Sequence, residues 1–359
     1  MSASDESPPK TGSSVRSTLS DNLDSVNDSA YGPLVKGALG FGFLAVLPML
    51  TQVSIGGWSP STILSVNILV VTLVFAYSGQ AWNILSGYTG YFSFGHAAFF
   101  GIGAYATMKL VNDFAINPWL GMLVGGVVAM FAGFFIGYLT FRYRLEGHYF
   151  ALATFAFAML IAVVVRNATE LGGALGYYRP FPRSYGAEYG LAAFQFKTQL
   201  PYYYVILAFL VIVTAVAWAI KHSQAGLYLF AIRENEDAAA SVGIPTFRYK
   251  MLVTGVSAFF IAWAGAFWSM YFETIRPDTV FGLFRNVEVL LPAVVGGLGT
   301  VSGAIVGAFI IFPLGEFLRT NVDQIVGLDD IVYGVALVVI ALLLPKGVLS
   351  LRGRFRGDD

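Results

Sequence analysis

The sequence predicts an all-α polytopic membrane protein with about 8 to 10 transmembrane helices, including short broken or re-entrant elements. Of its 359 residues, 57% are hydrophobic and 12% are charged. Soluble domains carry roughly 25% charged residues, so this is not the composition of a soluble globular protein. The mean hydropathy of +0.69 agrees with that conclusion. Several apolar runs also approach the roughly 20 residues that a helix needs to cross a bilayer.

The same composition excludes several classes of function. The 21 basic and 21 acidic residues balance, so nothing indicates a nucleic-acid partner. The chain has no cysteine, which excludes disulfides, thiol catalysis and thiolate metal sites. His96, His148 and His222 are too far apart in sequence for a metal motif. A phosphate-binding G-x-x-x-x-G-K-[ST] loop and a nucleophile–base–acid set are also missing. We therefore expect no catalytic residue and no cofactor bound by this chain.

The apolar runs divide the chain into a membrane domain and two polar tails. Residues 1–35 are rich in Ser, Asp, Asn and Pro, a composition that predicts a disordered cytoplasmic tail. Residues 36–345 form the transmembrane domain, which contains a polar loop at 222–249. Residues 346–359 form a short polar tail with three arginines.

Ten apolar runs predict the membrane segments of this domain. Residues 93–108 and 286–298 are too short for an ordinary crossing, and glycine-rich sequence adjoins both. Either one is interpreted as a half-helix or re-entrant element, which requires cover from protein or a water-filled cavity. The predicted segments lie near 36–53, 61–79, 93–108, 118–140, 147–166, 201–220, 250–272, 286–298, 301–318 and 327–344.

The orientation follows from the basic residues of the short loops. The basic regions are the turn at Arg142 and Arg144, the loop that holds Lys221, Arg233, Arg248 and Lys250, and the 346–359 tail. Both termini and the 222–249 loop are therefore predicted to be cytoplasmic. This arrangement requires that residues 286–298 and 301–318 enter and leave the membrane on the same side.

The polar loop contains a compact charged helix between residues 231 and 245. Asn235 can cap its N-terminus, and Glu236 and Asp237 follow in the first turn, where carboxylates favour the positive end of a helix. Gly243 suits a left-handed C-terminal residue, and Pro245 ends the helix. A short, well-capped helix between membrane spans is suited to being held by another protein. The alternative interpretation is a solvated loop that happens to be helical.

A few ionisable residues are predicted at membrane depth, where charge is costly. Arg285 and Glu288 are three residues apart, so they can pair across one helical turn. Arg166 and Arg285 are expected near span ends, where their side chains can reach the interface. His96 is interpreted as a hydrogen-bonded core residue. Glu288 and Glu316 are the candidate ion ligands of a secondary transporter.

Two glycine-rich elements echo each other. Gly87 and Gly90 repeat in spacing as Gly296 and Gly299, each before an apolar run. Transporters are often built from repeats whose broken helices meet at the substrate site. The alternative for glycines in membrane helices is ordinary close packing. The residues that this pattern places on a translocation pathway are Gly87, Gly90, Ser93, His96, Glu288, Gly296, Gly297 and Gly299.

Four stretches together resemble the LivM-type permeases of branched-chain amino acid ABC importers. They are Asn83–Tyr105, Leu145–Phe155, Arg233–Ile244 and Val289–Gly303, and their order and spacing agree over roughly residues 60–345. One stretch departs from the family pattern, because Gly172-Gly173-Ala174-Leu175-Gly176 continues into aromatic rather than small residues.

The resemblance implies that residues 222–249 form the coupling loop, whose helix docks on a separate ATP-binding subunit. It implies a prokaryotic cell-membrane importer with a second LivH-like permease, two ABC ATP-binding subunits and an extracytoplasmic binding protein, surrounded by membrane lipid. The alternatives are a urea or short-amide importer, whose permeases share these motifs, and an ion-coupled secondary amino acid transporter; a membrane-embedded enzyme is the weakest. The residues implied in coupling to the ATPase are Arg233, Glu234, Asn235, Glu236, Ala238, Ala239 and Gly243.

Overall fold

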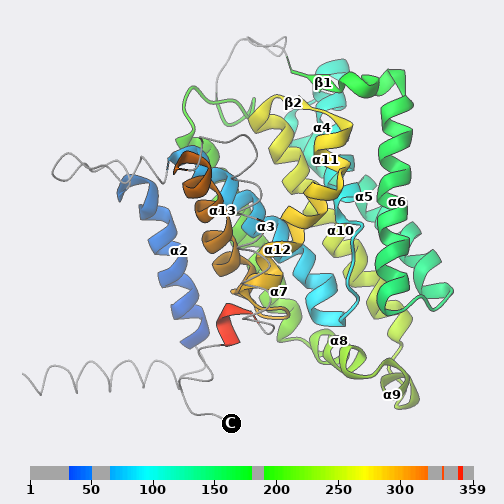
Figure 1. Ribbon diagram of the computed structural model, residues 1–359. Coiled ribbons are helices and arrows are strands. Elements are labelled where there is room, and N and C mark those ends of the chain that lie inside the picture. The colour runs from blue at the N-terminus through cyan, green and yellow to red at the C-terminus, as the bar shows by residue number, and fades with distance from the viewer. Residues whose placement is uncertain (1–31, 51–64, 180–189, 322–333, 335–346, 351–359) are drawn as a thin grey trace, which may run out of the picture. The chain divides into compact units, whose positions relative to one another are not determined.

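A computed structural model describes residues 32–50, 65–179, 190–321, 334 and 347–350 (Figure 1). The chain divides into two compact units, residues 1–50 and 51–359. In the first unit the described part is one helix, α2 (Gly32–Leu50). It begins at Gly32 rather than at 36, so the end of the predicted tail is helical. The predicted segment at 327–344 and most of both tails lie outside the described residues.

The described residues of the second unit are almost entirely helical, which confirms the predicted fold class. Six stretches are long and apolar enough to cross a membrane, and α4, α8, α9 and α13 complete the set of described α-helices. A single pair of two-residue strands, β1 and β2, is antiparallel, with Tyr177 opposite Ile275. The six stretches are α3 (Val66–Thr89), α5 (Pro118–Arg142), α6 (Gly147–Asn167), α7 (Leu200–Lys221), α10 (Thr246–Phe272) and Pro277–Gly296, which comprises α11 and α12.

The remaining elements are shorter or less apolar. They are α4 (His96–Phe114), α8 (Gln224–Glu234), α9 (Glu236–Ser241), α11 (Pro277–Phe281), α12 (Leu283–Gly296), α13 (Gly303–Asn321), the 3₁₀ turns η2 (Thr169–Leu171), η3 (Gly173–Leu175) and η4 (Val348–Ser350), and the strands β1 (Tyr177–Tyr178) and β2 (Thr274–Ile275).

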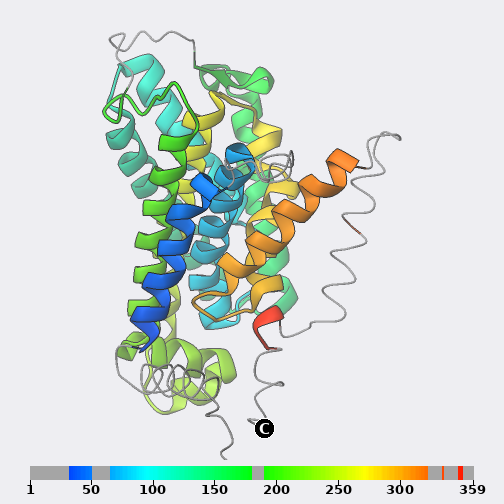
Figure 2. The same ribbon diagram turned by 90° about the vertical axis from the view of Figure 1, so that its left-hand side faces the viewer.

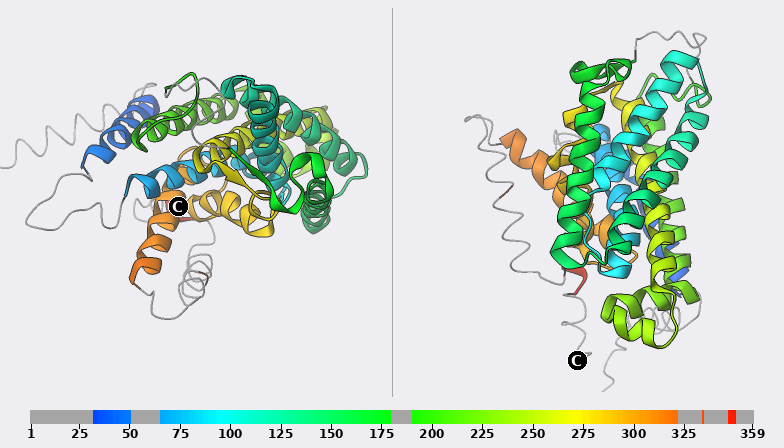
Figure 3. Two further views of the ribbon diagram at one scale, coloured as in Figure 1. Left: turned by 90° about the horizontal axis from the view of Figure 1, so that it is seen from above. Right: turned by 90° about the vertical axis from the view of Figure 1, so that its right-hand side faces the viewer.

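Helix α3 is the centre of this unit. Its residues from Ile68 to Thr89 are almost all buried, and it packs against α7, α10, α12 and α13. Seen from above, α3 and α10 lie between α13 on one side and α5 and α6 on the other (Figure 3). The outer helices α5 and α6 expose large apolar side chains such as Phe131 and Leu160, as a lipid-facing surface requires.

Helix α10 crosses α4 at backbone contact distance. A Cβ on Gly103 would lie 2.0 Å from the carbonyl oxygen of Ala262, and a Cβ on Gly265 would lie 1.8 Å from that of Phe100. Any side chain at either position would force the helices apart. These glycines therefore serve close packing, the ordinary role of small residues between membrane helices.

The first glycine-rich element differs from its prediction. Helix α3 does not end near 79 but continues to Thr89, and α4 begins at His96 rather than 93. Polar residues interrupt the apolar run after 79, but they are buried among neighbouring helices, so the helix continues through them. Gly90 ends α3 with φ of 77°, a left-handed conformation that favours glycine.

The second glycine-rich element is the turn of a helical hairpin. Helices α11 and α12 run from the β1–β2 end of the bundle to the α8–α9 end, and α13 runs back (Figure 1). Gly282 separates α11 from α12, so the short segment predicted at 286–298 is part of a broken 20-residue crossing. Residues 277–296 and 303–321 thus begin and end at the same end of the bundle, an arrangement that the predicted orientation requires.

Candidate functional site

Helices α8 and α9 lie together at one end of the bundle, beyond the ends of α7 and α10 (Figures 1 and 2). The compact helix predicted at 231–245 is two helices, because Asn235 has an extended conformation with φ of −161°. Asn235 ends α8 and caps α9, its Oδ1 accepting a hydrogen bond from the Ala238 amide at 2.9 Å. The predicted cap is confirmed. Ser223 caps α8 in the same way, so both helices have fixed beginnings.

Arg233 turns back toward the membrane helices. Its Nη1 donates a 2.7 Å hydrogen bond to the carbonyl oxygen of Gly87, near the end of α3. Its side chain fills the space beside two more glycines. A Cβ on Gly90 would lie 3.2 Å from Arg233 Cγ, and a Cβ on Gly299 would lie 2.5 Å from Arg233 Nη1. One side chain of α8 therefore contacts both glycine-rich elements.

The two glycine-rich elements also contact each other. Asn83 accepts a hydrogen bond from the Gly299 amide and donates one to the Thr300 carbonyl, both at 2.8 Å. Lys221, the last residue of α7, donates to the Gly299 carbonyl at 3.2 Å. A Cβ on Gly87 would lie 2.8 Å from the Gly299 nitrogen. The sequence repeat thus corresponds to two segments that lie side by side next to Arg233.

Glu236 of α9 forms a second inward connection. Its carboxylate accepts hydrogen bonds from Tyr91 at 2.5 Å, Lys250 at 2.5 Å and Thr246 at 3.1 Å. The Lys250 side chain is 5% exposed, and its ammonium lies 4.7 Å from the Tyr91 ring centre and 4.8 Å from that of Phe141. Tyr91 follows the end of α3 and Lys250 is in α10, so this cluster joins α9 to both.

The electrostatics of this cluster keep Glu236 ionised. Burial raises the pKa of the Glu236 carboxyl, but the hydrogen bonds from Lys250 and Tyr91 and the charge of Lys250 lower it more. The pKa is therefore below its ordinary value. A charged carboxylate and a nearly buried ammonium stabilise each other only while both are present.

The segment between α3 and α4 is non-helical and largely buried. Neighbouring side chains bond its amides: Ser86 accepts from Ser93 N at 3.3 Å, and Thr154 accepts from Phe94 N at 3.1 Å. His96 lies at the start of α4, with its ring nitrogens 3.0 Å from Ser93 Oγ and 2.8 Å from Ser257 Oγ. The hydrogen-bonded histidine is therefore confirmed, whereas the element predicted as short at 93–108 is a 19-residue helix, α4, that follows this non-helical segment. Non-helical backbone at membrane depth needs this kind of protein cover.

The predicted pair of Arg285 and Glu288 is confirmed, with Nη1 and Oε2 2.9 Å apart. The Arg285 guanidinium is buried over Trp268, 4.1 Å from the ring centre. Glu288 thus has a structural partner in α12, well before the glycine turn of that helix. Arg166, which was expected to reach the interface alone, pairs with Asp278.

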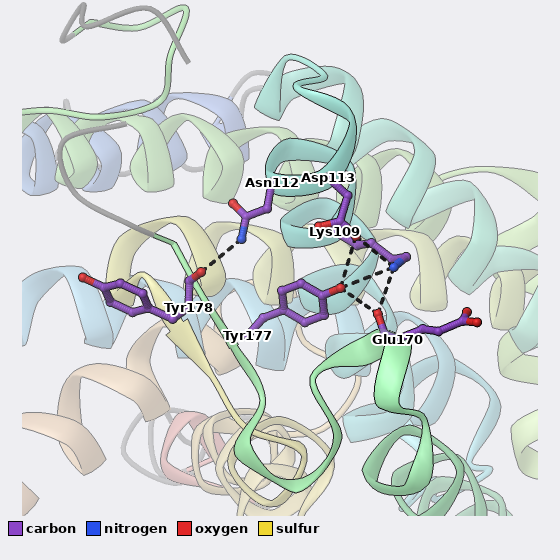
Figure 4. Close-up of polar contacts among 6 residues, drawn as sticks. All are labelled: Lys109, Asn112, Asp113, Glu170, Tyr177 and Tyr178. Carbon is purple, nitrogen blue, oxygen red and sulfur yellow. Dashed lines mark hydrogen bonds and ion pairs between the residues drawn. The ribbon is translucent and has the colours of Figure 1, made fainter. Parts of the chain in front are cut away.

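The aromatic departure from the family pattern has a structural role at the opposite end of the bundle. Figure 4 shows Lys109 of α4 bonding Asp113, the Glu170 carbonyl and the Tyr177 hydroxyl, at 2.9, 2.9 and 3.3 Å. Tyr177 itself donates to the Glu170 carbonyl at 2.7 Å. These bonds connect η2 and β1 to α4, so Tyr177 joins separate segments at the β1–β2 end of the bundle.

The predicted pathway residues therefore form no single cluster in the described part of the chain. Gly87, Gly90 and Gly299 adjoin Arg233, and Gly296 and Gly297 begin the turn that leads to Gly299. Ser93 and His96 lie deeper, and Glu288 lies toward the other end of α12. Whether they line a pathway stays a prediction.

Sequence reasoning missed the partners of these residues. Tyr91 and Lys250 bond Glu236 of α9, and Asn83 joins the two glycine-rich elements, but none of the three was a candidate. Of these three, Lys250 could have been noticed in the sequence, since it is a charged residue at the first position of the apolar run 250–272.

Comparison with known proteins gives a family match. The family model described as the permease component of branched-chain amino acid transport systems matches residues 64–341. The high-affinity branched-chain amino acid permease LivM of Escherichia coli is 25% identical over 305 residues, 80% of this chain and 70% of LivM. LivH of the same organism is 28% identical over 36% of this chain and 41% of LivH. The ribose import permease RbsC of Haemophilus influenzae is 34% identical over 30% of this chain and 35% of RbsC.

Proposed function

Since this chain belongs to the family of permease components of branched-chain amino acid transport systems, we propose that it is the transmembrane permease subunit of an ATP-driven importer. Its substrates would be branched-chain or related hydrophobic amino acids. Its partners would be a second, LivH-like permease, two ABC ATP-binding subunits and an extracytoplasmic binding protein. ATP would bind on the partner subunits, because this chain has no phosphate-binding loop.

The proposal is supported most directly by the directions in which the charged side chains of α8 and α9 point. Arg233 and Glu236 face inward and bond the membrane helices. Glu234 and Asp237 are exposed, and so are two large apolar residues, Leu227 and Val242, at 68% and 76%. Exposed apolar side chains bordered by charges are typical of a surface that binds another protein. We infer that this outer surface is the cytoplasmic docking site for an ATP-binding subunit.

The inward bonds supply a route from the docking surface to the transport pathway. A displacement of α8 would act through Arg233 on the end of α3 and on the turn before α13. A displacement of α9 would act through Glu236 on Tyr91, in the non-helical segment that precedes α4. Both targets are breaks between helices, where small changes of backbone angle reorient the next helix. Alternating access would result from the closing and opening of the ATP-binding subunits.

Charge reversal at the outer and inner residues tests this division. Glu234→Lys is expected to weaken binding of the ATP-binding subunit, measured by co-purification, because the exposed carboxylate faces the partner. Glu236→Lys is expected to retain the subunit but lose uptake, because it places a second ammonium beside Lys250. Arg248→Glu, at an exposed residue of the first turn of α10, is the matched control. Normal co-purification and normal uptake in both variants would refute the docking role.

A second experiment tests the energy source. Uptake of labelled leucine into proteoliposomes containing the whole complex is expected to require internal ATP and to survive collapse of ion gradients. Dependence on the gradient without ATP would favour the secondary transporter. Uptake of urea in place of leucine would favour the short-amide importer.

A further inference from the structure

A charged cavity lies beside α9 at the ends of the membrane spans. Its volume is about 430 Å³, within the range of about 300–1,000 Å³ that is usual for small-molecule sites. Its walls come from the last turn of α5, the turn leading into α6, helix α9 and the first turn of α10. Since α5 ends at Arg142 and α10 begins at Thr246, the cavity is at the level where a bilayer's head groups meet water.

The cavity holds charges of both signs that the described protein does not pair. Glu236 and Lys250 bond each other. The other four charged lining residues, Arg142, Arg144, Glu146 and Asp237, make no ion pair with any described residue. Two cations and two anions at the wall of one cavity fit a ligand that itself carries one positive and one negative charge.

A row of exposed aromatic side chains extends from this cavity along α5. Tyr138, which lines the cavity, is 51% exposed, and Phe135 and Phe131 follow at 61% and 63%. Their spacing of three and four residues places them on one face of the helix. On α10, Phe247 lines the cavity and its ring meets that of Tyr138 edge-on, with centres 6.1 Å apart. If a lipid head group occupied the cavity, the acyl chains of that lipid would therefore lie on this aromatic face.

We propose that this cavity binds the head group of a zwitterionic phospholipid of the phosphatidylethanolamine class, with its acyl chains along the exposed face of α5. The phosphate lies near Arg142 and Arg144, whose guanidinium groups are suited to phosphate oxygens. The ammonium lies near Glu146 and Asp237. Phosphatidylglycerol, an anionic phospholipid, lacks the ammonium and would leave these two carboxylates without a cationic partner. The site goes beyond the transport function, although its lining residues Glu236 and Asp237 also belong to the coupling region proposed above.

Lipid retention by the purified full chain tests the proposal. The chain is equilibrated in mixed micelles of phosphatidylethanolamine and phosphatidylglycerol in equal amounts, passed through gel filtration, and its retained lipids are measured by mass spectrometry. The wild type is expected to retain phosphatidylethanolamine in excess. Arg142→Gln with Arg144→Gln is expected to lower this retention about fivefold or more, as a loss of about 1 kcal/mol predicts. Arg248→Gln, in the first turn of α10 but outside the cavity, is expected to retain the wild-type amount.

A second variant tests the charge pattern rather than folding. Glu146→Gln with Asp237→Asn removes the two carboxylates and is expected to shift the preference toward phosphatidylglycerol. An elution volume equal to the wild type's shows that each variant is folded. Equal retention of the two lipids by the wild type would overturn the proposal, as would unchanged retention in the double arginine variant. Displacement of the lipid by millimolar leucine would instead assign the cavity to a soluble amino acid.

Discussion

Removal of the Arg233 guanidinium should weaken the link between ATP hydrolysis and uptake. In Arg233→Met the apolar stem remains beside Gly90, but the hydrogen bond to the Gly87 carbonyl is lost. Hydrogen bonds from charged donors contribute about 1.5–3 kcal/mol. Arg233 is exposed over much of its surface, so solvent screening reduces this to about 1–1.4 kcal/mol. That energy corresponds to a roughly 5- to 10-fold change.

The assay is the number of leucine molecules taken up per ATP hydrolysed by the complex in proteoliposomes. This ratio is expected to fall roughly 5- to 10-fold in Arg233→Met, with ATP hydrolysis and assembly retained. Arg248→Met is the matched control, because its side chain forms no ion pair or side-chain hydrogen bond with the described residues. An unchanged ratio in Arg233→Met would refute the role of the Arg233 bond. Loss of the ATP-binding subunit from the variant would instead place Arg233 on the docking surface.

The same contacts support three further predictions. Glu236→Gln is expected to lower the thermal stability of the chain at pH 7 but to change it less at pH 4. Because folding lowers the pKa of Glu236, its carboxylate stabilises the fold fully above the ordinary pKa of 4.5, and this stabilisation disappears as the pH falls through the lowered pKa. Equal losses of stability at both pH values would contradict this. Gly265→Leu is expected to prevent folding, since even a Cβ would lie 1.8 Å from the Phe100 carbonyl, and a normal gel-filtration profile would show that the α4–α10 contact is looser. Single cysteines at 296–303, in this naturally cysteine-free chain, are expected to react with water-soluble thiol reagents in one nucleotide state; no reaction in any state would remove this turn from the pathway.

The predictions that held were those that depend on local properties of the chain. Asn235 caps a helix because its side chain reaches an amide only three residues away. Arg285 and Glu288 pair because a helix places residues three apart on the same face. Both facts are contained in a few consecutive residues.

The predictions that failed concerned boundaries set by distant neighbours. Helix α3 continues to Thr89 through Gln80, Asn83 and Ser86, which are buried by neighbouring elements that cover that part of the helix. Hydropathy alone ended the span near 79, because polar residues are costly in lipid, whereas the protein buries these three and bonds the side chains of Asn83 and Ser86. Asn83 shows this directly, since its partners Gly299 and Thr300 are more than two hundred residues away.

The sequence by itself determined that this chain is a helical membrane protein, which family it resembles, and where its charged, capped helix begins. Composition, periodicity and capping are properties of short stretches, so no tertiary information is needed to read them. Only the tertiary structure decided which way the charges of that helix point. Arg233 and Glu236 were grouped with Glu234 as docking residues, but both turn inward because Gly87, Tyr91 and Lys250 offer them partners. Those partners come from distant parts of the chain, and packing over the whole bundle decides which parts meet.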